Sequence, residues 1–92
     1  MTGSNPWSDG TALAGPLQSL MGLEVTTAIG RCMGCGRVAA MAEARVFDHA
    51  PGLVARCPTC DQALVRLVRG SGRAWLDLRG LTWLQLPVPD QT

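Results

Sequence analysis

The sequence predicts one small, mainly β domain built of β-hairpins, with a short helix near its N-terminus. The chain has 92 residues, a length that suits a single domain. Hydrophobic residues make up 47% and charged residues 16%, which is the balance of a folded chain rather than a disordered one. From residue 24 onward, short segments of alternating apolar and polar residues are separated by Gly and Pro, as in antiparallel strands.

The N-terminal segment predicts the helix. Leu13, Leu17, Leu20 and Met21 recur at helical spacing, between a capping residue at Asp9 or Thr11 and a terminating Gly22. Pro16 removes a backbone donor inside this pattern, so we expect either a kink there or a short helix that begins near Pro16. The domain is expected to span residues 9–86, between a flexible tail at 1–8 and a second tail at 87–92. Trp7 either anchors the first tail on the domain or is exposed.

The first half of the domain is predicted to form three strand segments. Residues 25–29 read as a strand, and residues 53–56 return the chain after a turn at Pro51-Gly52. Residues 37–47 are ambiguous because their alanines favour a helix. Hairpin geometry instead makes 44–48 a strand.

The second half predicts a hairpin with a defined register. Segments 63–69 and 73–79 flank Gly70-Ser71-Gly72, and a two-residue turn at Ser71-Gly72 places Val68 opposite Trp75 and Arg66 opposite Asp77. The predicted core face carries Val65, Leu67, Ala74, Leu76 and Leu78. The opposite face carries Arg66, Val68, Trp75, Asp77 and Arg79. Residues 81–86 alternate again and predict a last strand.

The four cysteines form two C-x-x-C pairs and indicate a metal site. Cys32, Cys35, Cys57 and Cys60 are the only cysteines in the chain, and 21 residues separate the pairs. Two cysteines spaced in this way supply one edge of a tetrahedron, and a second pair supplies the opposite edge. The pattern predicts one zinc ion per chain, with iron as the alternative because a tetrahedral site of four sulfurs suits both metals.

The residues around the cysteines agree with two tight knuckles. Gly34 and Gly36 allow left-handed backbone angles in the first knuckle. In the second knuckle Pro58 presets one turn angle, and Asp61 stands where Gly36 stands in the first. Four thiolates around a divalent ion leave a net charge of −2, and the arginines within two residues of a ligand are positioned to offset it. These arginines are Arg31, Arg37 and Arg56.

Other roles for the cysteines and for the single histidine are weaker interpretations. Two disulfides disagree with the cytoplasmic location expected for a chain that lacks a signal-peptide pattern and an apolar run long enough to span a membrane. A C-x-x-C redox centre usually lies in a thioredoxin-like βαβ context, which this sequence lacks. His49 follows Asp48 in a predicted turn, so we interpret it as an exposed residue rather than a fifth ligand or a base.

Two cysteine knuckles bracketing β-hairpins resemble a zinc ribbon. More closely, the segments DGTALAGPL (9–17), GRCMGCG (30–36), APGLV (50–54), RCPTC (56–60) and WLDLRG (75–80) resemble an uncharacterised family of small bacterial zinc-ribbon-like proteins. The resemblance covers roughly residues 9–86 and implies four cysteine ligands, here Cys32, Cys35, Cys57 and Cys60. It implies no activity, since the family is a domain of unknown function.

Three functions are compatible with these features, and none of them is catalytic. The favoured one is a structural zinc-binding module that mediates protein interaction, with Trp75 and its neighbouring arginines as the suspected surface; the competing interpretation places Trp75 in the core, under the helix. A nucleic-acid-binding zinc ribbon is the second, although eight arginines against seven acidic residues give a pI of only about 7.7. The third is a rubredoxin-like iron electron carrier. Four ligands fill a tetrahedral site, and no catalytic set is evident, so no enzyme is expected.

Partners are predicted only by class. A protein partner, whose identity the sequence leaves open, is favoured over nucleic acid, and no membrane association is expected. Self-association through an exposed strand edge and Trp75 is compatible with the sequence, without a fixed stoichiometry.

Overall fold

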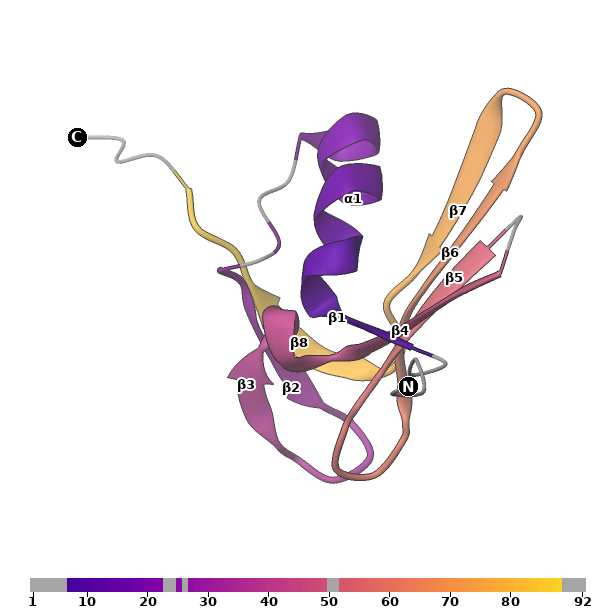
Figure 1. Ribbon diagram of the computed structural model, residues 1–92. Helices are drawn as coiled ribbons and strands as arrows, with labels where there is room; N and C mark the ends of the chain where they lie inside the picture. The colour runs from indigo at the N-terminus through magenta and orange to yellow at the C-terminus, as the bar shows by residue number, and fades with distance from the viewer. Residues whose placement is uncertain (1–6, 23–24, 26, 50–51, 89–92) are drawn as a thin grey trace, which may run out of the picture.

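A computed structural model describes residues 7–22, 25, 27–49 and 52–88 of the chain. Two antiparallel sheets and a short helix make up the fold (Figure 1). The elements in chain order are β1 (Ser8–Asp9), a 3-10 turn (Gly10–Leu13), α1 (Ala14–Met21), β2 (Ile29–Cys32), β3 (Val38–Ala40), a second 3-10 turn (Met41–Glu43), β4 (Arg45–His49), β5 (Gly52–Arg56), β6 (Ala63–Gly70), β7 (Arg73–Asp77) and β8 (Leu81–Gln85). The mainly β class with one short N-terminal helix is therefore confirmed.

The strands form a five-stranded sheet in the order β1-β4-β5-β6-β7 and a three-stranded sheet in the order β3-β2-β8. The β6–β7 register is the predicted one, with Val68 opposite Trp75 and Arg66 opposite Asp77. The β2–β3 and β5–β6 connections are the two cysteine knuckles, and they lie side by side at one end of the molecule (Figure 1).

The helix begins close to Pro16, the second of the two outcomes expected. Asp9 caps the preceding 3-10 turn by accepting a hydrogen bond from the backbone N–H of Thr11. α1 then starts at Ala14, which places Pro16 in the first helical turn, where its missing N–H has no partner to lose. Gly22 ends α1 in the left-handed conformation with φ of 66°.

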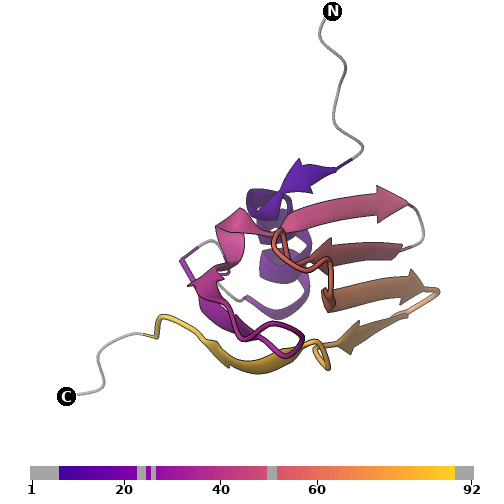
Figure 2. The same cartoon turned by 90° about the horizontal axis from the view of Figure 1, so that it is seen from below.

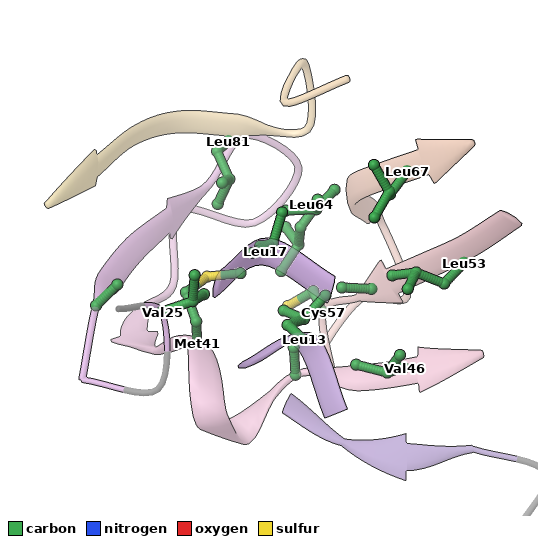
Figure 3. Packing of buried hydrophobic residues seen from close by; sticks show 14 of the residues in the cluster. Leu13, Leu17, Val25, Met41, Val46, Leu53, Cys57, Leu64, Leu67 and Leu81 are labelled. Atoms are coloured by element: carbon green, nitrogen blue, oxygen red, sulfur yellow. The ribbon is translucent and has the colours of Figure 1, made fainter. Parts of the chain in front are cut away.

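The core lies between the two sheets and the helical segment (Figure 3). Leu13 and Leu17, from the predicted helical stripe, are buried in it, while the side chains of Leu20 and Met21 lie outside the described set. The other buried residues are Val25, Ala28, Cys32, Met41, Ala44, Val46, Leu53, Ala55, Cys57, Leu64, Val65, Leu67 and Leu81. Two of the four cysteines thus belong to the hydrophobic core.

Two strand predictions need correction. The segment 25–29 was predicted to be a strand throughout, but β2 begins only at Ile29, since Val25 and Ala28 serve as core residues of an irregular connection. The predicted core face of the β6–β7 hairpin is buried only at Val65 and Leu67 and half-buried at Leu76. Ala74 is exposed because β5 begins opposite Val68 and the hairpin tip extends beyond it, and Leu78 is exposed at the other end of the hairpin, where it follows the last residue of β7.

Trp75 is not a core residue. Its side chain is 55% exposed on the face of the sheet opposite the buried Val65 and Leu67, so the interpretation that the helix covers it is wrong. The ambiguous segment 37–47 divides between β3, a 3-10 turn and β4, which agrees with a strand over 44–48.

Both predicted tails are only partly within the described structure. Residues 1–6 of the first tail and 89–92 of the second lie outside the described residues. Ser8 pairs with Val46 in β4, and the guanidinium carbon of Arg45 lies 5.0 Å from the centre of the Trp7 ring. Trp7 is therefore anchored on the sheet by a cation–π contact.

Candidate metal centre

The four cysteine sulfurs converge on one point at the end of the two hairpins. All four Sγ atoms lie within 4.8 Å of one another, as the spacing of the two pairs predicts. Two contacts join the knuckles, with 3.5 Å between the Sγ atoms of Cys32 and Cys60 and 3.8 Å between those of Cys35 and Cys57. A disulfide needs sulfurs about 2.05 Å apart, so all four cysteines are free thiols here.

The sulfur spacing fits a tetrahedral metal ion. With metal–sulfur bonds of about 2.3 Å, the edge of a regular tetrahedron is about 3.8 Å, close to the two sulfur–sulfur distances between the knuckles. The donor set is four soft sulfur ligands, which suits zinc and iron rather than magnesium or calcium. The four cysteines are therefore arranged to bind one metal ion.

The first knuckle is closed by backbone hydrogen bonds between β2 and β3. The N–H of Cys32 donates to the carbonyl of Arg37, and the N–H of Gly36 donates to the carbonyl of Cys32, both at 2.9 Å. Gly36 takes the left-handed conformation with φ of 79°, as predicted. The N–H of Gly34 points at the sulfur of Cys32, 3.3 Å away, and so stabilises negative charge there.

The second knuckle repeats this pattern at the same sequence offsets. The N–H of Cys57 donates to the carbonyl of Gln62 at 2.9 Å, and the N–H of Asp61 donates to the carbonyl of Cys57 at 2.8 Å. Asp61 has φ of 68° and is the only left-handed residue other than glycine in the described chain. It replaces Gly36 in the equivalent position, as the sequence predicts.

Gly34 serves a different purpose from the one predicted. It is not among the glycines with positive φ, so left-handed freedom is not what the knuckle requires there. A Cβ atom at this position would lie 3.2 Å from the sulfur of Cys60 and 3.2 Å from the Cβ of Gln62. Gly34 is needed because the two knuckles pack closely against each other.

The two cysteines of each pair differ in burial. Cys32 and Cys57 are buried, at 3% and 2% exposure, while Cys35 and Cys60 face solvent. The first cysteine of each pair therefore joins the site to the hydrophobic core, and the second closes it from outside. The site has the position of a structural centre that fastens the hairpin ends together.

Thiol pKa values within the cluster diverge because its sulfurs interact. Burial raises the pKa of Cys57. The backbone N–H groups of Cys60 and Thr59, together with the neighbouring thiols, lower it by more, so that the pKa falls to about 7. The N–H of Gln62 lowers the pKa of Cys60, yet burial and the other three sulfurs raise it to about 12. Cys57 therefore gives up its proton more readily than Cys60, and a bound cation would favour the thiolate form of the ligands.

The arginines near the site have separate partners. Arg56 donates to the backbone carbonyl of Asp61 at 3.0 Å and so supports the second knuckle. Arg37 pairs with Glu43, and the guanidinium of Arg31 lies next to Gly36 in the first knuckle. That all three offset the charge of the thiolates stays a prediction.

The remaining sequence candidate, His49, is the last residue of β4 and pairs with Gly52. Among the described residues the clustered metal donors are the four cysteines alone.

Sequence reasoning missed the link between Met33 and Gly80, where the N–H of Met33 donates to the carbonyl of Gly80 at 2.9 Å. This bond connects the first knuckle to the turn before β8. No local sequence pattern predicts it, because its two residues are far apart in the chain.

Comparisons with known proteins add a family but no activity. No helix in the described part of the chain has both the length and the apolarity that crossing a bilayer requires. No curated protein and no solved structure matches the chain significantly. A family model matches residues 3–89, a range that includes both knuckles and every strand. The chain therefore belongs to the family of unknown function DUF6510.

Proposed function

We propose that this protein is a non-enzymatic zinc-binding module whose single ion stabilises the fold and whose exposed sheet surface binds another protein. The convergence of four sulfurs within 4.8 Å at the end of two hairpins carries the proposal. A small domain buries too little surface for its core alone to give ample stability, and a structural ion supplies the missing stabilisation. Four protein ligands leave no open position for water, which favours structure over catalysis.

Zinc is proposed over iron because it needs no redox partner and is the usual occupant of paired cysteine knuckles. We expect elemental analysis of protein purified without added metal to give one zinc per chain and a colourless solution. Removing the ion with a chelator should abolish the dispersed amide NMR signals of a folded domain, and adding zinc should restore them. One iron per chain with red colour would instead support electron transfer. Folded protein without metal would contradict the proposal.

A protein partner is favoured over nucleic acid by the surface of the five-stranded sheet. Its outer face presents Trp75 and Val68, both exposed, beside Arg66 on the neighbouring strand. Exposed aromatic residues next to arginines are typical of protein interaction hot spots. Arg37 and Arg79 form ion pairs with carboxylates of the same chain, which reduces the positive surface available to phosphates.

The nucleic-acid alternative predicts a strong dependence on the remaining arginines. Arg66 and Arg69 are both exposed on β6. If protein binding is the function, we expect the double variant Arg66→Glu, Arg69→Glu to elute from heparin at a salt concentration close to that of the parent. A matched double variant, Arg66→Gln, Arg69→Gln, separates loss of charge from its reversal. A large drop for both variants, together with salt-dependent binding of the parent to single-stranded oligonucleotides, would favour nucleic acid.

A further inference from the structure

Strand β7 is an open edge of the five-stranded sheet. It lies at the end of the order β1-β4-β5-β6-β7, and Figure 2 shows no element of the described chain beyond it. The opposite edge is β1, which has only two residues and offers little to pair with. β7 has five residues, no proline and an unbroken register with β6, so it lacks two devices that often block edge pairing, a proline and a bulge.

The β6–β7 register determines which backbone groups are free. Gly70 and Arg73 flank a two-residue turn and form the first hydrogen-bonded pair of the hairpin. Because hydrogen-bonded and non-hydrogen-bonded pairs alternate, Trp75 and Asp77 also bond toward β6. The N–H and C=O groups of Ala74 and Leu76 consequently face the open edge.

This edge is complementary to itself. If a second β7 pairs antiparallel about a two-fold axis at Trp75, Ala74 of one chain meets Leu76 of the other, and these are the residues whose backbone groups are free. Trp75 then faces Trp75 in a non-hydrogen-bonded pair, where side chains approach most closely. In the same register Arg73 of each chain stands opposite Asp77 of the other, on the same face as Trp75.

The charges at these two positions are suited to that contact. Arg73 has no carboxylate partner among the described residues, since Gly70 stands opposite it in β6. Hydrogen bonds from the side chain and the backbone N–H of Arg79 lower the pKa of Asp77 to about 2, so its carboxylate is ionised at neutral pH. Opposite charges directly across an antiparallel pair stabilise it, and like charges destabilise it.

The other long edge lacks this complementarity. β8, with sequence LTWLQ, carries no charged residue, so no pairing of charges would select one register over another. Its own pairing with β2 is also interrupted by a register shift between Arg31 and Cys32.

We propose that the partner of the β7 edge is a second copy of this chain, so that two five-stranded sheets join through antiparallel β7 strands with Trp75 on the two-fold axis and Arg73 paired with Asp77 across it. The proposal rests on the protein-interaction role proposed above and names the partner. It is independent of which metal the four cysteines bind.

The primary test is the mass of the metal-loaded protein in solution over a concentration series, by light scattering after size exclusion. We expect a concentration-dependent rise toward twice the 9.7 kDa of one chain. Arg73→Glu places two like-charged pairs across the axis and should shift the midpoint of dimerisation at least tenfold toward higher concentration. Arg69→Glu, a matched control with the same change of net charge on the adjacent strand, should leave the midpoint within about twofold of the parent.

Mixing two variants gives a sharper test than either alone. Arg73→Glu and Asp77→Arg should each be monomeric, but a mixture restores both opposite-charge pairs and should form a one-to-one heterodimer. Asp77→Arg also loses its contacts with Arg79; if it does not fold, Ala74→Pro tests the same edge without mixing, since this proline removes only an N–H that faces the edge and should abolish dimerisation.

Failure of this inference and failure of the proposed function give different results. A folded, metal-loaded parent that stays monomeric at every concentration would overturn the dimer and leave the zinc module standing. A dimer with the same midpoint in the parent and in Arg73→Glu would place the contact elsewhere and also overturn the inference. A parent that is folded without metal would instead overturn the proposed function.

Discussion

Cys35→Ser is expected to yield a chain that neither holds metal nor folds. Serine keeps its hydroxyl proton at neutral pH and is a poor replacement for a thiolate, so the site loses one of four ligands. Structural zinc contributes an apparent stabilisation of about 10–16 kcal/mol in small finger domains, which is comparable to the ~5–15 kcal/mol that separates folded from unfolded states of typical domains. A weakened site therefore removes the fold along with the ion.

The position of Cys35 makes the result interpretable. Its side chain is exposed, so its replacement costs little buried apolar surface, unlike replacement of the buried Cys57. The matched control is Met33→Ser in the same knuckle, where a larger side chain that is 61% exposed is lost without removing a ligand. We expect that control to retain one metal ion per chain and to change stability by no more than about 0.5 kcal/mol.

Two measurements are made on each isotope-labelled variant: its metal content and its amide NMR spectrum. Cys35→Ser should give narrow dispersion and substoichiometric metal, and Met33→Ser should superimpose on the parent. A soluble Cys35→Ser chain with native dispersion and no metal would show that the hydrophobic core suffices. The four cysteines would then serve a purpose other than stability.

The candidate site was predictable from the sequence because its chemistry is local. Two residues separate the cysteines of each pair, so each pair forms one turn whatever the rest of the chain does, and only the meeting of the turns depends on tertiary structure. The equivalence of Asp61 and Gly36 was predictable for the same reason. Gly34 was not, because its requirement comes from the approach of Cys60 across the two knuckles.

The fold was predictable where one element specifies its neighbour. The β6–β7 register follows from a two-residue turn and was found as expected. The first and last residues of strands that pair across long sequence separations were harder to predict from the sequence. Residues 25–29 have the composition of a strand, yet the burial of Val25 and Ala28 in an irregular segment outweighs it, and β2 pairs with β8 some fifty residues away. Strand alternation placed Trp75 on the face opposite the core, but only the tertiary structure decides whether the helix covers that face, and it does not.

The second large effect is expected at Gly80, which lies in the turn between β7 and β8. A Cβ atom there would lie 1.7 Å from the carbonyl oxygen of Ala63 and 2.7 Å from the Cα of Leu64, both backbone atoms at the start of β6. Its own carbonyl accepts the N–H of Met33 in the first knuckle. Gly80 therefore joins the start of β6, just after the second knuckle, to the first knuckle, and any side chain forces these backbones apart.

Gly80→Ala should accordingly destabilise the metal-loaded protein by about 3 kcal/mol or more, a fall of the thermal midpoint on the order of 15 °C for a domain of this size. Gly15→Ala is the matched control, because a Cβ there meets nothing within 4 Å and the residue lies in α1. Alanine is the better helix former by roughly 0.5–1 kcal/mol, so this variant should melt a few degrees above the parent. Thermal melts at equal metal loading measure both. Equal midpoints for Gly80→Ala and the parent would mean that the turn before β8 does not approach Ala63 closely, and that the contact between this turn and the start of β6 contributes little to stability.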